Sequence, residues 1–176
     1  SPVDVISAEE FKNLRVSTVA ELSKYLSIAS GSNFQTNALD GVDQGMANIT
    51  LRGMDHASTL VLINKKRQTQ SGTPSDEGEG YVDINIIPEI ALNRVEILKD
   101  GATALYGSDA VAGVINFKTY QQFNGMRLAL GSQKTSNYDQ RDNSLGALFG
   151  GEALGGNYVF ALSSLNRSPL NASKIP

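Results

Sequence analysis

Hydrophobic and polar positions alternate along several stretches of the chain, and this alternation predicts most of its strands. The clearest stretch runs from Arg94 to Lys118, where strand-forming residues flank a short segment bounded by glycines. This order predicts a strand, a helical turn and a second strand. The run from Thr59 to Asn64 is apolar almost throughout, which is typical of a strand buried on both faces. The stretch from Asn48 to Arg52 alternates and predicts a further short strand.

Two helices are predicted near the N-terminus, after an extended segment from Pro2 to Ile6. The sequences from Ser7 to Glu10 and from Thr18 to Glu21 each match a capping box, in which side chains satisfy the first free N–H groups of a helix. A further helical turn is expected over Glu89 to Asn93, because Pro88 suits the first helical position. The two helices have apolar faces that indicate core packing: Phe11 and Leu14 in the first, and Val19, Leu22, Tyr25 and Leu26 in the second.

The pattern changes from Gly125 onward, where apolar and polar residues alternate in three stretches. A polar hinge from Ser132 to Asn143 separates the first two stretches, and a tight turn from Leu154 to Asn157 separates the last two. Strands of about ten residues joined by alternating long and short turns are typical of transmembrane β-barrels. An ordinary soluble meander would give the same periodicity, so the pattern alone does not separate the two.

Composition excludes several classes of function. The 176 residues include no cysteine, which removes thiol catalysis, disulfides and cysteine-based zinc sites. The net charge is −3 and the only basic run is Lys65 to Arg67, so no nucleic-acid partner is expected. Asp55, His56 and Ser58 lie too close in sequence to converge as a catalytic triad, and we expect no enzyme. The acidic tip Asp76–Glu79 does not have the spacing of a calcium loop, and we expect no metal and no cofactor.

Four segments resemble, in the expected order, the plug domain of TonB-dependent outer-membrane receptors. They are PVDVISAEEF, TVAELSKYL, NITLRGMDHASTLVLINKKR and VDINIIPEIALNRVEILKDGATALYGSDAVAGVINFKT. The last segment is the most specific, with Glu96, Gly101, Tyr106, Gly107, Ala110, Gly113 and Asn116 at the family's positions.

The resemblance implies an α+β plug domain, a small mixed sheet with short helices, over residues 1–122. It also implies that residues 123–176 form about three first strands of a transmembrane antiparallel β-barrel. Three strands cannot close a barrel, because an open edge in lipid leaves backbone groups unsatisfied. We therefore expect the chain to be part of a larger receptor.

The function implied by the resemblance is TonB-dependent, energy-coupled uptake of a large, scarce nutrient across the bacterial outer membrane, with the plug gating the barrel. An iron–siderophore complex is the default substrate, and an oligosaccharide or cobalamin are alternatives. The implied partners are TonB, through a segment preceding Ser1, the remainder of the barrel, the extracellular nutrient and outer-membrane lipid. The alternative is a soluble α+β binding module, in which Tyr158, Phe160 and Leu162 would be buried in a core.

The resemblance also assigns roles to individual residues. Arg52 and Lys99 are expected to face glutamates on the inner barrel wall and to lock the plug in place, Lys99 more weakly than the usual Arg because a lysine cannot bind a carboxylate bidentately. The family often has Asp-Gly where this chain has Asn64–Lys65, so the turn there is expected to differ locally. The loops from Ser30 to Gly45 and from Gln68 to Tyr81 are expected to face outward and contact substrate. The candidate contacts are Asn33, Phe34, Gln35, Arg67, Gln68, Gln70 and Tyr81.

Overall fold

The computed structural model describes residues 3–14, 19–22, 48–52, 54, 58–72, 80–134 and 141–168. The chain forms two compact units. The first contains residues 1–87 and 92–119, and the second contains residues 88–91 and 120–176. The short segment 88–91 therefore belongs to the second unit, although the chain on both sides of it belongs to the first.

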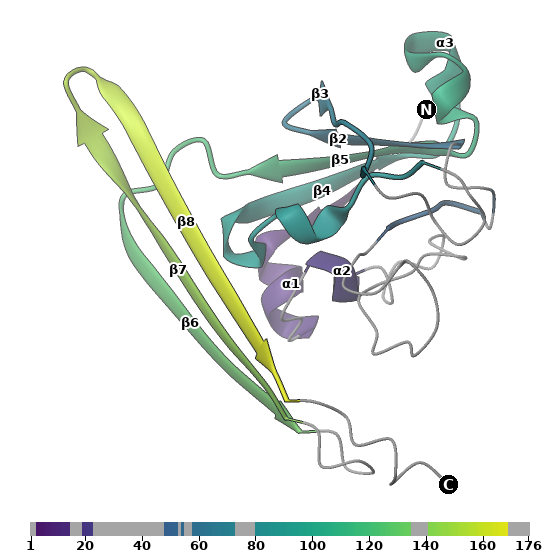
Figure 1. Ribbon diagram of the computed structural model, residues 1–176. Helices are drawn as coiled ribbons and strands as arrows, with labels where there is room; N and C mark the ends of the chain where they lie inside the picture. Colours follow the sequence, from purple (N-terminus) through teal and green to yellow (C-terminus); the bar gives the residue numbers. More distant parts are fainter. Residues whose placement is uncertain are drawn as a thin grey trace, which may run out of the picture. The chain divides into compact units, whose positions relative to one another are not determined.

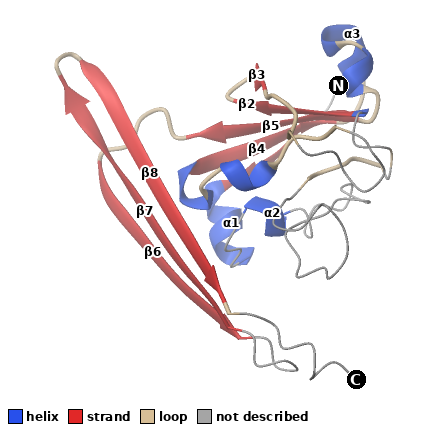
Figure 2. Ribbon diagram, viewed as in Figure 1, coloured by secondary structure: helices blue, strands red, loops and turns tan. Residues whose placement is uncertain are grey.

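The first unit is built on a five-stranded sheet in the order β1-β4-β5-β2-β3 (Figure 1). The pair β2–β5 is parallel and the other three pairs are antiparallel, so the sheet is mixed, as predicted. The strands are β1 Val3–Ser7, β2 Thr59–Ile63, β3 Lys66–Arg67, β4 Leu92–Leu98 and β5 Gly113–Thr119. The helical elements of this unit are α1 Ala8–Leu14, α2 Val19–Leu22, α3 Ala102–Tyr106 and the 3₁₀ turns η3 Ile84–Ile86 and η5 Ser108–Ala110 (Figure 2).

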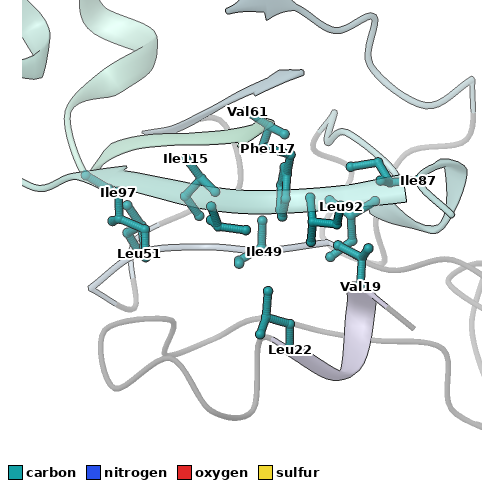
Figure 3. Packing of buried hydrophobic residues seen from close by; sticks show 13 residues of the cluster. Val19, Leu22, Ile49, Leu51, Val61, Ile87, Leu92, Ile97, Ile115 and Phe117 are labelled. Carbon is teal, nitrogen blue, oxygen red and sulfur yellow. The ribbon is translucent and has the colours of Figure 1, made fainter. Parts of the chain in front are cut away.

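Both faces of this sheet are covered, which explains why β2 is apolar almost throughout. On one face Val19 and Leu22 of α2 pack with Ile115 and Phe117 of β5 in the main core (Figure 3). A second, smaller cluster packs residues of the sheet against the α3–η5 segment and consists of Leu60, Leu62, Ala102, Ala110 and Val114. The predicted strand, helical turn and strand between Arg94 and Lys118 are thus β4, α3 and β5.

The first capping box is confirmed. The backbone N–H of Ser7 donates to Glu10 Oε2 at 2.6 Å, and the Glu10 N–H donates to Ser7 Oγ at 3.5 Å. The bond from the Ser7 backbone, followed by that from its hydroxyl, lowers the pKa of Glu10. The second predicted box begins outside the described residues, as do Tyr25 and Leu26, but Val19 and Leu22 are buried as predicted.

The predicted strand from Asn48 to Arg52 does not form. Residues 48–51 are all buried, whereas a half-buried strand would bury alternate residues only. The backbone N–H of Leu51 donates to the Thr59 side chain at 3.0 Å, and Arg52 adopts a positive φ of 59°. Packing of Ile49 and Leu51 into the core explains the apolar alternation, without any pairing into the sheet.

The turn between β2 and β3 places Asn64 and Lys65 at φ values of 51° and 66°. A type I′ turn requires positive φ at both central residues, and Asp-Gly satisfies the same requirement. Both φ values therefore have the sign that this turn type requires, and the expected local difference from the family stays a prediction. What differs is that Lys65 has a side chain in the left-handed region, where glycine is favoured.

The second unit contains a three-stranded antiparallel sheet in sequence order (Figure 1). Its strands are β6 Gly125–Lys134, β7 Arg141–Ala153 and β8 Gly156–Arg167. The polar hinge is shorter than predicted, because Ser132 and Asn143 are paired opposite each other within the β6–β7 ladder. The turn at Leu154–Gly155 is a tight one with φ values of 53° and 77°.

The predicted helical turn after Pro88 is the 3₁₀ turn η4 Glu89–Ala91, two residues shorter than expected because β4 begins at Leu92. The Tyr120 N–H donates to the Ala91 carbonyl at 3.0 Å. A Cβ added to Gly146 of β7 would lie 3.3 Å from Ile90 Cβ, so η4 and β7 are in close contact. These contacts explain why η4 groups with the second unit.

Candidate functional site

The two predicted lock residues meet at the end of β4. One guanidinium nitrogen of Arg52 donates to the Lys99 carbonyl at 2.9 Å and to Asp100 Oδ1 at 2.7 Å. Lys99 forms an ion pair with Asp4 of β1. The Arg52 and Lys99 side chains are 45% and 31% exposed. Exposed ion pairs contribute little free energy, so either cation could exchange its present carboxylate for another at small cost.

A second polar cluster lies within the sheet and centres on Glu96 of β4. Arg94 Nε donates to its carboxylate at 2.9 Å, Lys118 Nζ lies 3.2 Å away, and the Asn116 amide donates at 3.1 Å. Burial raises the pKa of Glu96, but the hydrogen bonds from Lys118, Asn116 and Arg94 outweigh it and lower the pKa below its ordinary value. Glu96 is therefore an ionised, well-bonded group rather than a proton donor.

Asn116 extends this cluster to the neighbouring hairpin. Its side chain is 6% exposed, and its Oδ1 accepts the Lys65 N–H at 2.9 Å while its amide group donates to Glu96. Asn64 makes a second link, donating from its side chain to Thr119 Oγ1 at 2.8 Å and accepting the Thr119 N–H at 3.0 Å. Together these bonds hold the strained β2–β3 turn against β5. The sequence motif contained Glu96 and Asn116 but gave no sign that they bond to each other.

Arg67, a predicted substrate contact, is engaged within the first unit. Its guanidinium donates to Asp109 Oδ2 at 2.6 Å and to the Tyr106 carbonyl at 2.5 Å. The side chain is nevertheless 51% exposed. Arg67 thus joins β3 to the α3–η5 segment while leaving part of its surface accessible.

The other predicted contacts have different surroundings. The Gln68 amide donates to the Lys66 carbonyl at 2.8 Å, and Gln70 is exposed. Tyr81 is only 3% exposed and lies in the core, where a bound molecule would not reach it in this conformation. The Ser71 N–H donates to the Tyr81 carbonyl at 2.6 Å and brings the two ends of the predicted loop together. Asn33, Phe34 and Gln35 lie outside the described residues, as do His56 and the acidic tip.

In the second unit, Arg127 of β6 lies near two aromatic rings. Its guanidinium carbon is 5.4 Å from the centre of the Tyr120 ring and 5.2 Å from that of Phe123, distances at which a cation is attracted to an aromatic face. Burial raises the pKa of Glu89 in η4, and the positive charge of Arg127 partly offsets this effect.

The outward-facing apolar residues bear on the choice between a barrel strand and a soluble meander. Tyr158, Phe160 and Leu162 are 41%, 55% and 65% exposed, rather than buried in a core. The same face of the sheet exposes five further apolar side chains: Met126, Leu128, Leu130, Leu145 and Phe149. A contiguous apolar face of this kind is typical of a surface that contacts a membrane or another protein.

Within the described residues, no cluster of three or more acidic or histidine side chains could hold a metal ion. No helix in the described part of the chain has the length and apolar character needed to cross a membrane.

This architecture, a small mixed sheet with short helices followed by long antiparallel strands, defines the class of protein. The model of the TonB-dependent receptor plug domain matches residues 1–114, and the chain belongs to this family. The iron-regulated outer membrane virulence protein of Vibrio cholerae serotype O1 is 40% identical over 82 residues, which is 44% of this chain and 13% of that protein. The vitamin B12 transporter BtuB of Vibrio vulnificus is 31% identical over 117 residues, covering 66% of this chain and 17% of that protein.

The solved structure of the siderophore receptor PirA from Acinetobacter baumannii has the same fold. It superposes on 97% of this chain with a TM-score of 0.69 and 24% identity. The chain covers 25% of that structure. The chain thus spans only a small part of the length of the relatives that it matches.

Proposed function

We propose that the chain is the plug and the first barrel strands of a receptor in the bacterial outer membrane. In this proposal residues 1–122 form the plug, residues 123–176 begin the barrel, and the receptor takes up a large, scarce nutrient with energy delivered through TonB. The main support is that a plug-family domain is followed directly by strands with an exposed apolar face. Those strands have 10, 13 and 12 residues, and a tilted strand needs about 9–11 to cross a bilayer.

The relatives favour an iron–siderophore complex as the nutrient. One relative is named as iron-regulated and one of the matching structures is that of a siderophore receptor, whereas another relative is named as a vitamin B12 transporter. We infer that the exposed side chains of Arg67 and Gln70 and the half-buried side chain of Gln68 contribute to binding, together with the loop that contains Asn33, Phe34 and Gln35. Because Tyr81 is buried, we infer that it supports these side chains from the core and does not contact the nutrient itself.

The Arg52 and Lys99 pair supports a release mechanism for the plug. Both cations now bond to carboxylates of their own unit, and these exposed pairs are weak. We propose that both cations also engage acidic side chains of the barrel wall, and that TonB-dependent pulling disrupts these contacts.

Uptake by cells tests the proposal. The full-length receptor would be produced in a strain lacking its own copy, and uptake of labelled ferric siderophores, cobalamin and oligosaccharides would be compared. We expect uptake of a ferric siderophore that stops when TonB is deleted or the proton-motive force is collapsed. A receptor that accumulates one of the other nutrients would change the substrate, and TonB-independent uptake would contradict the mechanism.

A soluble binding module is the second candidate. It would require the apolar residues of β8 to be covered by other parts of the protein. A full-length product that stays monodisperse in water without detergent would favour this module over the receptor.

A further inference from the structure

The guanidinium of Arg67 is already bonded to a carboxylate of its own unit. One of its terminal nitrogens donates to Asp109 Oδ2 at 2.6 Å, and the other donates to the Tyr106 carbonyl at 2.5 Å. A guanidinium has more N–H donors than these two bonds use, so it can still bind a further acceptor. Asp109 thus occupies part of a group that the proposed function assigns to nutrient binding.

The fold brings Asp109 to Arg67 although the two residues are 42 positions apart in the chain. Asp109 lies in η5, and its neighbour Ala110 packs in the second hydrophobic cluster together with Ala102 of α3. The carboxylate is 58% exposed and the arginine side chain 51%. Both groups are therefore accessible to a third charged group in the described part of the chain.

The hairpin that carries Arg67 is basic. Lys65, Lys66 and Arg67 are consecutive and all exposed. Among the described residues, Asp109 is the only acidic side chain that forms an ion pair with any of them. Three positive charges beside one negative charge give the turn a positive potential, and such a potential attracts anions.

Lys65 adds its charge from a strained backbone position. Its φ of 66° lies in the left-handed region, where a β-carbon is unfavourable and glycine is favoured. The bond from the Lys65 N–H to Asn116 and the two bonds between Asn64 and Thr119 hold the turn in this conformation. Strain at an exposed lysine indicates that its side chain has a role other than stabilising the turn.

The Arg67–Asp109 pair is weak enough to be exchanged. An exposed ion pair changes an equilibrium by about fivefold at most. An anion that binds an arginine through two parallel N–H bonds forms a stronger contact than the single bond to Asp109. An uncharged acceptor lacks the charge attraction that the carboxylate has. Occupation of Arg67 by Asp109 therefore disfavours uncharged ligands and admits anions that bind better than Asp109.

We propose that Asp109 is a specificity-determining residue of the nutrient site. It occupies Arg67 in the empty receptor, and an anionic group of the nutrient displaces it, assisted by the charges of Lys65 and Lys66. The displaced carboxylate is then left in water. This inference rests on the proposed function, in which Arg67 contacts the nutrient, and it narrows the nutrient to one with anionic oxygen atoms on its surface.

Binding of two ferric siderophores to the full-length receptor in detergent tests this role. The probes are an anionic ferric tris-catecholate and an uncharged ferric trishydroxamate, and titration calorimetry measures both dissociation constants. The wild-type receptor is expected to prefer the anionic probe. Arg67→Gln is expected to weaken binding of that probe about tenfold, because a hydrogen bond between charged groups is lost.

Asp109→Asn separates competition from support. If Asp109 competes with the nutrient, this variant should bind the anionic probe up to about fivefold more tightly than wild type. Most of that gain should disappear in Arg67→Gln with Asp109→Asn, because the competitor no longer has a cation to occupy. If Asp109 only holds Arg67 in place, Asp109→Asn weakens binding instead. Weaker or unchanged binding overturns the proposal.

Lys65→Gly tests the charge of the turn. It keeps the backbone N–H that bonds to Asn116, removes the strain, and is expected to fold at least as stably as wild type. Loss of the charge should weaken binding of the anionic probe about twofold at low salt. Unchanged affinity would overturn the role assigned to Lys65. Glu9→Gln and Lys12→Gln on exposed α1 are matched controls that should leave both affinities unchanged.

Uptake by cells separates failure of this inference from failure of the proposed function. TonB-dependent uptake that prefers an uncharged nutrient overturns the role of Asp109 and leaves the proposed function intact, whereas absence of TonB-dependent uptake contradicts the proposed function itself. If Arg67→Gln destabilises the empty receptor to heat more than Asp109→Asn does and leaves both affinities unchanged, Arg67 binds a carboxylate of the barrel and the assignment to the nutrient is wrong.

Discussion

Ile90 occupies the space that a side chain at Gly146 would need. An added Cβ at Gly146 would lie 3.3 Å from both the Cβ and Cδ1 atoms of Ile90. Ile90 is 6% exposed, and the backbone next to it is held by the bond from the Tyr120 N–H to the Ala91 carbonyl. Glycine at position 146 is therefore a packing requirement of the contact between η4 and β7.

Gly146→Val should disturb this contact. Overpacking a well-filled site costs about 1–3 kcal/mol, so thermal unfolding of the full-length receptor is expected at a lower temperature. Gly156→Val in β8 is the matched control, because the nearest atom to an added Cβ there is 3.9 Å away. The double variant Ile90→Ala with Gly146→Val is expected to recover part of the stability lost in Gly146→Val. If the stability losses of the two single variants simply add, the two residues are not in contact.

Asn116→Leu should destabilise the first unit at nearly constant side-chain volume. It removes a bond to Glu96 and leaves the Lys65 N–H without its acceptor, and such a loss costs about 1–3 kcal/mol. Denaturant unfolding measures the free energy, and faster hydrogen exchange at the Lys65 amide locates the effect. Asn93→Leu, at a half-exposed position of β4, is expected to cost less than about 0.5 kcal/mol. Equal losses of unfolding free energy in the two variants would contradict the hydrogen-bond network around Asn116.

Glu96→Gln should change how stability depends on pH. The folded pKa of Glu96 is lowered from its ordinary value of 4.5, so its stabilising contribution is present above pH 4.5 and is lost as the pH falls through the folded pKa. The variant is expected to be less stable than wild type near neutral pH, and the two stability curves should converge in acid. Urea unfolding over a series of pH values measures both curves.

Glu89→Gln should change the pH dependence of stability in the opposite direction. The pKa of Glu89 is raised above 4.5, so its ionisation opposes folding as the pH rises from 4.5 through the folded pKa. Removing that ionisation is expected to leave the receptor as stable as wild type, or more stable, at neutral pH. A loss of stability like that of Glu96→Gln would show that the Arg127 charge outweighs the burial of Glu89.

Lys99→Met distinguishes the proposed lock from a local ion pair. If Lys99 pairs only with Asp4, the change should cost less than about 1 kcal/mol, because the pair is exposed. If Lys99 also neutralises buried carboxylates of the barrel, leaving them unpaired should cost about 3–5 kcal/mol. Release of the plug from the full-length receptor by urea, followed by protease accessibility, measures the difference. Lys12→Met on exposed α1 is the control, and an equally small effect at both sites would contradict the lock.

Local signals in the sequence predicted several elements correctly. The capping box joins Ser7 and Glu10, which are only three residues apart, so the local sequence is enough to predict it. The alternation in β6–β8 and the apolar run of β2 likewise follow from the period of the strand and the burial of its two faces. The family resemblance rested on four segments in the expected order, of which the one containing Arg94 to Lys118 is the most specific.

Tertiary contacts decided the rest, because they join residues far apart in the chain. The alternation of apolar and polar residues at Asn48–Arg52 fits both a strand and an extended segment beneath a sheet. Only the packing of this segment against the core distinguishes the two structures. The burial of Tyr81 and the bonds of Arg67 to Tyr106 and Asp109 depend on folding of distant segments.

The sequence by itself therefore determined the class of protein and most of its strands, since these depend on short periodic patterns. Only the tertiary structure placed η4 with the β6–β8 sheet, paired Glu96 with Asn116, and brought Asp109 to Arg67. Each of these relationships depends on strand register or on packing between segments separated in the chain. Local sequence does not encode such relationships, because a shift of one residue in register would move every side chain to the other face.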